Sequence, residues 1–274
     1  MGLLTIDKNK CKKDGLCAAD CPTVIIQLKD KESFPELVPG GEQMCLRCGH
    51  CVAICPHGAL SHREVPLSKC PPIRKEVAIG PEQAEQFLRS RRSVRFFKDE
   101  PLEPDKLQQL IETARYAPTA SNAQLVEWIV INDREKIHEI SEKVVEWMRQ
   151  VLEKGPPPAS APYLPLLVAA WDMGMDTVLR GAPGLIIAAA PKADANGMVD
   201  ITLALSYLEL AAPGLGFGTC WAGLLQGALL SHEPLKQVVG IPEGYPHHYP
   251  MMIGVPKARY FRVPERKKPK ITWK

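Results

Sequence analysis

The C-terminal two thirds of the chain alternate between segments with helical spacing of apolar residues and short continuous apolar runs. Residues 104–117 and 134–154 place apolar side chains three and four positions apart, which predicts two amphipathic helices. Their inward positions are Leu107, Leu110, Ile111 and Ala114 in the first helix, and Ile137, Ile140, Val144 and Met148 in the second. A largely apolar helix is predicted over residues 200–212, and Pro213 should stop it early.

The continuous apolar runs predict strands between these helices. Residues 127–132 and 184–190 are expected to form buried strands, 251–256 the last strand, and 219–225 a strand and a turn. A Pro-rich loop over 155–165 separates two of these segments. The pattern predicts an α+β domain over residues 81–274, which is long enough to bury its own core.

The first part of the chain has a different pattern, dominated by cysteine. Seven of the nine cysteines lie within the first 55 residues. An odd total, in a chain whose N-terminus does not have the length of apolar segment typical of a secretion signal, argues against a disulfide framework. Clustered thiols in a reducing compartment are better interpreted as metal ligands.

The second cysteine cluster has the complete spacing of an iron–sulfur motif. Cys45, Cys48, Cys51 and Cys55, followed by Pro56, fit C-x2-C-x2-C-x3-C-P at every position. The close spacings let three thiolates of one tight loop point toward a single cluster. A zinc site could use paired C-x2-C, but zinc requires neither the third cysteine at that spacing nor the Cys-Pro ending.

The first cysteine cluster is a repeat of the second, displaced by 34 residues. The offset relates Cys11, Cys17, Cys21 and Pro22 to Cys45, Cys51, Cys55 and Pro56, and it relates Asp14 to Cys48. The two segments resemble the two-cluster bacterial ferredoxin module, in which the motifs exchange their fourth ligands. The resemblance implies one [4Fe-4S] cluster on Cys21, Cys45, Cys48 and Cys51, and a second cluster on Cys11, Cys17 and Cys55, with Asp14 at its fourth corner.

Asp14 leaves the type of the second cluster open. A carboxylate is a harder ligand than a thiolate and should hold iron less firmly, so this cluster is either [4Fe-4S] with an oxygen ligand or [3Fe-4S] with an empty corner. Alternatively, Asp14 is a solvated loop residue and only one cluster forms. Residues 22–44 are a longer insert than compact ferredoxins have. His50 and His57 lie in or beside the second motif, where they either form hydrogen bonds near the cluster sulfurs or face solvent.

A linker is predicted between the cysteine segment and the α+β domain. Residues 64–80 contain three prolines and no sustained apolar period, and Cys70 within them is interpreted as an incidental thiol. The predicted organisation is therefore an iron–sulfur domain over 1–63, a linker over 64–80 and a second domain over 81–274.

Charge and hydropathy exclude two classes of partner. A formal net charge of +3 and a pI of about 8.3 are too mild to predict nucleic-acid binding. Apolar runs are short and bounded by Pro or Gly, so no membrane span is expected. The expected compartment is the cytoplasm.

Four stretches of the second domain, in order, resemble the FMN-dependent nitroreductase family. They are "RRSVRFF" (91–97), "APTASNAQLVEW" (117–128), "LGFGTCWAG" (215–223) and "IGVPKARYFRVPERK" (253–267). The resemblance implies an FMN-binding α+β fold for the region from about residue 82 to the C-terminus.

The resemblance also implies an FMN site. Arginine forks match phosphate oxygens in pairs, and Arg91, Arg92, Ser93 and Arg95 follow a short helix in a loop suited to this role. Arg266 and Lys267 resemble further phosphate contacts, and Asn122 and Gln124 resemble an Asn-x-Gln loop beside the isoalloxazine. The backbone N–H of Gly223 is expected to face flavin N5. The "QLVEW" sequence lacks the proline that the family usually has after this glutamine.

The function implied is two-electron reduction of a small electrophile, such as a nitroaromatic, a quinone or an activated alkene, by a homodimer. NAD(P)H is the family's common reductant, whereas the attached cluster domain favours a one-electron donor such as ferredoxin. Two alternatives stay open: an electron-transfer or redox-sensing protein without a dedicated substrate, and another reaction of the same fold, such as reductive dehalogenation or flavin destruction. No protein acid or base is expected to be catalytic.

Overall fold

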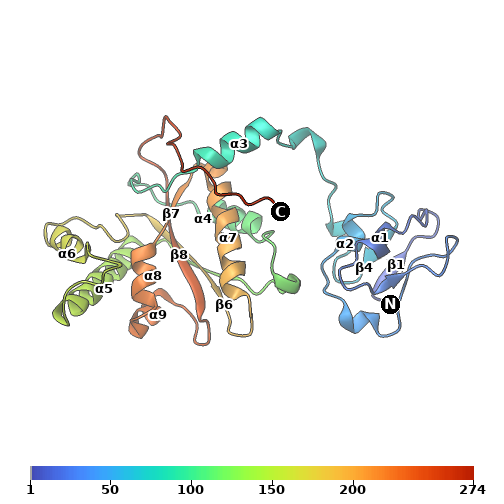
Figure 1. The fold of residues 1–274 in the computed structure, drawn as a ribbon, viewed down its shortest axis with the longest axis horizontal. Coiled ribbons are helices and arrows are strands. Elements are labelled where there is room, and N and C mark those ends of the chain that lie inside the picture. The colour runs from blue at the N-terminus through green and yellow to red at the C-terminus, as the bar shows by residue number, and fades with distance from the viewer. Residues whose placement is uncertain (1) are drawn as a thin grey trace. The chain divides into compact units, whose positions relative to one another are not determined.

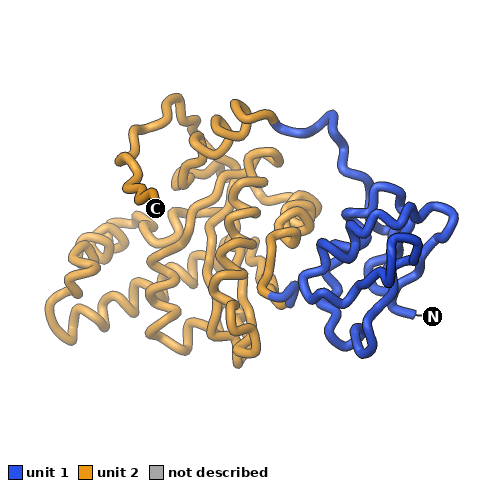
Figure 2. The backbone as a smooth tube through the Cα atoms, turned by 45° about the vertical axis from the view of Figure 1, so that its right-hand side comes forward, with its two compact units in different colours: residues 1–79, 121–123 blue, residues 80–120, 124–274 orange. Residues whose placement is uncertain are grey.

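The computed structural model describes residues 2–274, and the chain folds into two compact units. Unit 1 comprises residues up to Ile79 together with Ser121–Ala123, and unit 2 comprises Gly80–Ala120 and Gln124–Lys274 (Figure 2). The division falls at the end of the predicted linker. Within unit 1, Leu67 and Cys70 of that linker pack against the buried cluster that includes Cys17, Ile25 and Val52.

Unit 1 is built from short elements joined by tight turns. Its helices are α1 (Leu16–Ala19) and α2 (His50–Ala53), with the 3-10 turns η1 (Gly41–Met44), η2 (Leu67–Lys69) and η3 (Lys75–Val77). The antiparallel strands β1 (Leu4–Ile6) and β4 (Leu60–His62) form one pair, and β2 (Ile26–Gln27) and β3 (Glu36–Leu37) form the other. The predicted insert thus contributes a two-stranded sheet and a 3-10 turn.

The 34-residue repeat of the sequence is also a repeat of backbone conformation. The helices α1 and α2 begin at equivalent positions, and each is preceded by a glycine in the left-handed region. Left-handed residues occur in pairs at this offset: Lys13 and Arg47 (φ 57° and 54°), Gly15 and Gly49 (74° and 75°), Val24 and Gly58 (54° and 56°). Equivalent turns close with equivalent backbone bonds, such as Val24 N–H to Cys21 O and Gly58 N–H to Cys55 O.

Unit 2 is a four-stranded antiparallel sheet covered by helices on both faces (Figure 1). The strand order is β5 (Glu127–Ile131), β6 (Gly184–Ala190), β8 (His247–Gly254) and β7 (Gly218–Trp221). All seven residues of β6 are buried because this central strand packs on both faces. The edge strand β5 is partly exposed, with Val130 39% exposed, so the prediction of a buried strand there was wrong.

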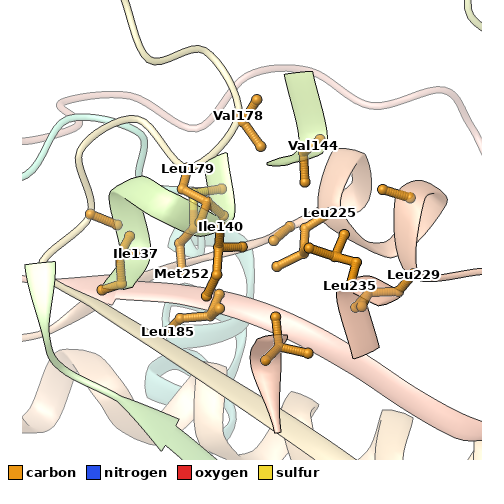
Figure 3. Close-up of a cluster of buried hydrophobic side chains, with 14 of the residues drawn as sticks. Ile137, Ile140, Val144, Val178, Leu179, Leu185, Leu225, Leu229, Leu235 and Met252 are labelled. Carbon is orange, nitrogen blue, oxygen red and sulfur yellow. The ribbon is translucent and has the colours of Figure 1, made fainter. Parts of the chain in front are cut away.

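The two faces of the sheet carry separate cores. On one face, α5 (Arg134–Glu153), α6 (Leu164–Asp172), α8 (Gly223–Leu229) and α9 (Glu233–Val239) enclose Leu185, Ile187 and Met252 (Figure 3). On the other face, α4 (Pro104–Ala114) and α7 (Gly197–Ala211) pack over Ile186, Met251 and Ile253. Alternate residues of β6 therefore face opposite cores, as the pleat requires.

The predicted amphipathic helices are confirmed. The inward positions Ile137, Ile140, Val144 and Met148 of α5 are buried, and Asp133 caps the helix by accepting the N–H groups of Glu135 and Lys136. In α4, Leu107, Leu110 and Ala114 are buried and Ile111 is partly buried against the same core. The turn predicted near residue 223 is instead the start of α8.

The segment Gly197–Leu215 is long and apolar enough to cross a membrane by composition alone, although the sequence pattern had predicted no such segment. In the structure, α7 ends at Ala211, and Pro213 lies in the 3-10 turn η5 (Ala212–Leu215). Ile201, Leu205 and Leu208 are fully buried against the sheet, so α7 is a core helix of unit 2. Unit 2 also contains α3 (Pro81–Ser90), whereas the 3-10 turn η4 (Ala120–Asn122) begins in unit 2 and continues in the Ser121–Ala123 segment of unit 1.

Candidate functional site

Four cysteine side chains of unit 1 line one cavity. They are Cys45, Cys48 and Cys51 of the second motif and Cys21 of the first, joined by apolar residues such as Ile26 and Leu37. The left-handed conformations of Arg47 and Gly49 turn the chain tightly between these cysteines, so that their side chains converge. A cavity lined by thiols from both motifs matches the ligand exchange expected of a two-cluster module.

The remaining cysteines of the motifs gather around Cys17. Burial raises the pKa of the Cys17 thiol, and so do the neighbouring negative groups of Asp14, Cys11 and Cys55. Asp14 therefore lies beside the three cysteines with which the sequence groups it. Its carboxylate accepts the N–H of Leu16 at 3.1 Å and lies 3.5 Å from His57 Nε2.

The thiol arrangement fits an iron–sulfur cluster better than a single ion. Among residues 2–274, no group of three or more Cys, His, Asp or Glu side chains is close enough together to hold one metal ion. A cubane binds one thiolate per iron, so its ligands are spread more widely than those of a zinc ion. Burial, followed by the neighbouring Cys48 and Cys45, raises the pKa of Cys51 to about 11, so cluster binding must displace its proton.

Backbone N–H groups are directed at the cysteine sulfurs. Arg47 donates to Cys45 Sγ and Ala59 donates to Cys55 Sγ, each at 3.4 Å. At Cys21, burial would raise the pKa of the thiol, but the N–H groups of Ile25, Thr23 and Val24 and the Thr23 hydroxyl outweigh it and lower that pKa. These donors favour the thiolate, which is the form of cysteine that binds iron, over the thiol.

One histidine at this site is not suggested by the motif spacing. His62, in β4, lines the cavity, and its Nε2 lies 3.5 Å from Cys45 Sγ. Burial lowers the pKa of this imidazole, with Glu64 acting in the opposite direction. His50 and His57, which the sequence suggested as cluster neighbours, are exposed, although His50 also lines this cavity.

In unit 2, four of the six predicted phosphate ligands meet at one surface cavity, which Ser93 and Arg95 do not line. Arg91 and Arg92 follow α3 directly and line this cavity together with Arg266 and Lys267 of the C-terminal segment. Arg91 Nη1 donates to Glu209 Oε1 at 2.8 Å, while Arg92 Nη1 donates to the Arg91 carbonyl oxygen at 2.7 Å. Basic groups from opposite ends of this unit's sequence are thus brought together by the fold.

A second cavity brings Arg95 beside Gly223. Gly223 begins α8 directly after the strand β7, and Trp221, Cys220 and Arg180 line the same cavity. The segment before Arg95 is fixed to the sheet, because Val94 N–H donates to Thr219 O and the Tyr260 hydroxyl donates to Ser93 O. Cys220 is buried, as expected for a packed residue.

The remaining predicted flavin contacts lie in a strained loop. Ser121, Asn122 and Gln124 have φ values of 52°, 55° and 52°, in the left-handed region that disfavours side chains. Among the described residues, Asn122 and Gln124 do not line either of the two basic cavities. Ala120, the unit 2 residue directly before Ser121, donates its N–H to both carboxylate oxygens of Asp200.

Glu209 is a further residue that local sequence patterns did not identify. It lies on α7, is 7% exposed, and accepts the indole N–H of Trp221 at 3.0 Å as well as Arg91. The Glu209 carboxylate therefore links Arg91, which lines the cavity with Arg266, to Trp221, which lines the cavity with Gly223. In the sequence, Glu209 is marked only by being a charged residue on a helix that is predicted to be largely apolar.

Comparison with known proteins agrees with this two-part organisation. The model described as the nitroreductase family matches residues 88–255, and a 4Fe-4S dicluster domain model matches residues 3–56. The fold and these matches define a nitroreductase-family domain that follows a 4Fe-4S dicluster domain at the N-terminus. Since the larger match covers more than half of the sequence, the chain belongs to the nitroreductase family.

Individual relatives are more distant. An "NADPH-dependent oxidoreductase" of Staphylococcus saprophyticus is 27% identical over 189 residues, 64% of this chain and 66% of the relative. The chain thus spans just under two thirds of that protein's length. A "Putative NADH dehydrogenase/NAD(P)H nitroreductase" of Archaeoglobus fulgidus is 26% identical over 64% of this chain and 87% of its own length.

Solved structures share the fold of unit 2. The crystal structure of a Bacteroides fragilis nitroreductase with bound FMN superposes with a TM-score of 0.58 and 18% identity, covering 69% of this chain and 97% of the neighbour. The α+β nitroreductase fold and the cluster-type N-terminal domain expected from the sequence are therefore confirmed.

Proposed function

We propose that this oxidoreductase passes electrons from two iron–sulfur clusters to FMN, which reduces a small electrophile. The observation that carries the proposal is the convergence of Cys21, Cys45, Cys48 and Cys51 on one cavity in a chain of the nitroreductase family. A cluster supplies one electron at a time, whereas FMN accepts two. Two single-electron transfers and a proton thus yield the equivalent of a hydride for the substrate.

The proposed FMN site combines the two basic cavities of unit 2. Arg91, Arg92, Arg266 and Lys267 would hold the phosphate, because several fork-shaped or ammonium donors suit its double negative charge. The Gly223 N–H would face the isoalloxazine. Arg95 lines the cavity of Gly223 and not that of Arg91, so its predicted role as a phosphate ligand rests on the family pattern. Ser93, Asn122 and Gln124 remain proposed contacts on the basis of the family pattern. FMN bound to a nitroreductase of the same fold supports this assignment.

The proposed clusters follow the grouping of the thiols. Cys21, Cys45, Cys48 and Cys51 would hold a [4Fe-4S] cluster. Cys11, Cys17 and Cys55 would hold the second cluster with Asp14 at its fourth corner, as either [4Fe-4S] or [3Fe-4S]. This grouping is supported by Asp14, Cys11 and Cys55, which all raise the pKa of the Cys17 thiol. Together with FMN, these clusters would supply the redox chemistry of the enzyme.

The electron donor and the substrate are proposed by class. Relatives named as NADPH-dependent and as an FMN reductase [NAD(P)H] support a nicotinamide donor. The dicluster domain, matched over residues 3–56, instead favours a donor such as reduced ferredoxin. The substrate would be a nitroaromatic, a quinone or an activated alkene, and the protein would act in the cytoplasm.

A second copy of the chain is the proposed partner. Phe87 and Leu88 of α3, and Phe261 and Trp273 of the C-terminal segment, are between 42% and 88% exposed. Apolar side chains of this size are normally covered, and a symmetric homodimer is the commonest way to cover them. Light scattering of the purified protein should give twice the chain mass of 30.3 kDa, and a mass of one chain would contradict this proposal.

The proposal is tested by removing one cluster ligand in the full chain. Cys48→Ala should lower iron content and abolish turnover with reduced ferredoxin, while the dithionite-reduced variant should still reduce a nitroaromatic. Cys70→Ala is the matched control, because Cys70 lies outside both cysteine motifs and its thiol donates a hydrogen bond to Pro66 O. Ferredoxin-driven turnover of Cys48→Ala at the rate of the control would refute electron entry through the clusters.

A further inference from the structure

The hydrogen bonds of His62 fix which ring nitrogen carries its proton. His62 is 1% exposed, and its Nδ1 accepts the backbone N–H groups of Glu64 at 3.0 Å and Val65 at 3.2 Å. An imidazole nitrogen that accepts hydrogen bonds has no proton of its own. The proton of the neutral ring therefore lies on Nε2.

This protonated nitrogen is directed at a cysteine sulfur. His62 Nε2 lies 3.5 Å from Cys45 Sγ, within range for an N–H···S bond. The turn from His62 to Val65 holds the ring in place, and β4 holds the turn, since His62 pairs with Leu4 in the β1–β4 sheet. Cys45 Sγ thus receives two donors, His62 Nε2–H and the Arg47 backbone N–H.

We propose that His62 raises the reduction potential of the cluster held by Cys21, Cys45, Cys48 and Cys51 by donating a hydrogen bond to the Cys45 thiolate. Reduction adds negative charge to a cluster and its sulfurs, so a donor aimed at a ligand sulfur stabilises the reduced state more than the oxidised state. The inference rests on the proposed presence of that cluster. It adds a positioning residue that acts through a ligand and does not bind iron.

The internal repeat indicates that only one of the two proposed clusters receives a histidine hydrogen bond at this position. The 34-residue offset relates His62 to Leu28, just as it relates β4 to β2. Leu28 has no side-chain donor, so the sulfur of Cys11, which is equivalent to Cys45, has no counterpart of the His62 bond from this position. The two clusters should therefore differ in potential for a reason beyond Asp14, and the second cluster serves as an internal reference.

The test is a potentiometric titration followed by EPR on anaerobic full-length protein. His62→Phe keeps a ring of similar size without a donor. At a fixed solution potential, its ratio of reduced to oxidised cluster should fall about fivefold, the effect of one ordinary hydrogen bond. For a one-electron couple this corresponds to about 40 mV. His62→Gln, which keeps an amide N–H, should recover part of the shift, and the other cluster should not move.

Two controls separate the possible results. His138→Leu removes an exposed histidine of α5 in unit 2 and should leave both potentials unchanged. Wild-type protein without iron would refute the proposed clusters and not the role of His62. Normal iron content with an unchanged potential in His62→Phe would overturn the inference.

The role of His62 can still be tested if a variant fails to hold its cluster. If His62→Phe loses iron, His62→Leu, which reproduces the residue at the equivalent position 28, takes its place in the titration. Loss of iron from both, with retention in His62→Gln, would support a required hydrogen bond. Loss from all three variants would make His62 a residue of structure only and would overturn the inference.

Discussion

Arg91 and Glu209 are joined by a hydrogen-bonded ion pair of 2.8 Å, although 118 positions separate them in the chain. The carboxylate is almost fully buried, whereas about a third of the Arg91 side chain is exposed. Glu209 therefore holds one nitrogen of the guanidinium, and Arg91 lines the cavity that it shares with Arg266. The pair orients the residue that we propose as a phosphate ligand.

Arg91→Ala should weaken FMN retention by roughly 1.5–3 kcal/mol, the value of a charge-assisted hydrogen bond. It should also lower stability, because Glu209 is left as a buried carboxylate without its cation. The FMN dissociation constant, measured by flavin fluorescence on dilution, checks the first effect, and thermal unfolding checks the second.

Glu209→Gln separates these two effects. The amide oxygen can still accept the Trp221 indole N–H, but the ion pair is lost, so FMN binding should weaken less than in Arg91→Ala. FMN affinity equal to wild type in Arg91→Ala would place the phosphate elsewhere.

The core of unit 2 could be predicted because its signals are local. Ile137, Ile140, Val144 and Met148 follow helical spacing, and this spacing alone identifies the buried face of α5. The cysteine motif is equally local, since three ligands of one cluster lie within seven residues. The backbone repeat from Lys13 to Gly58 follows from the same 34-residue offset.

Pairings between distant segments could not be predicted. The sequence does not indicate that α7 brings Glu209 to Arg91, nor that the turn after β4 directs His62 at Cys45. The exposure of β5 depends on its position at the sheet edge, which its apolar composition does not reveal. In each case the deciding contact is set by topology and not by local propensity.

Asp14→Cys should make the cluster of Cys11, Cys17 and Cys55 more resistant to loss of iron, because a thiolate replaces a harder carboxylate ligand. Wild-type protein prepared anaerobically should contain seven or eight irons per chain by the proposed ligand count, seven if the Asp14 corner is empty. Iron analysis and EPR during exposure to air measure both quantities.

The contact between Asp14 and His57 provides the control for this prediction. His57→Ala removes the neighbour of the carboxylate and leaves all cysteines in place. An unchanged rate of iron loss in Asp14→Cys would show that residue 14 is not at the cluster. Four irons per chain, without a second EPR signal, would contradict the two-cluster proposal.

Asp200→Asn should stabilise unit 2 at neutral pH. Burial raises the pKa of Asp200 above its usual 3.8, against the lowering effect of the Ala120 N–H bond. Between the unfolded and folded pKa values the folded state binds more protons, so stability falls as pH rises through this window. The neutral amide avoids this loss and can still accept from Ala120 N–H.

The stabilisation should therefore be full above the folded-state pKa and should shrink as pH falls toward 3.8. Thermal unfolding of the two proteins from neutral to mildly acidic pH measures the trend. Asp105→Asn changes an exposed carboxylate in the first turn of α4 and serves as the control. Greater stability of wild type at neutral pH would show that the carboxylate is needed to hold the loop at Ala120.

A chain that begins at Gly80 should fold, dimerise and bind FMN, because the two cores of unit 2 lie on either face of its own sheet, whereas Cys17, Ile25 and Val52 form a separate core in unit 1. The shortened protein should reduce a nitroaromatic when its flavin is reduced chemically. It should lose most of its turnover with reduced ferredoxin, because covalent attachment of the clusters supplies the flavin at high effective concentration.

Comparing the two donors decides how electrons enter. If the shortened protein matches the full chain with ferredoxin, the clusters are not the input path. If NADPH drives both proteins at the same rate, hydride transfer to the flavin is sufficient and the cluster domain has another role. A fall confined to the ferredoxin assay, with FMN content and unfolding temperature of residues 80–274 preserved, would leave unit 1 as the route by which single electrons reach the flavin.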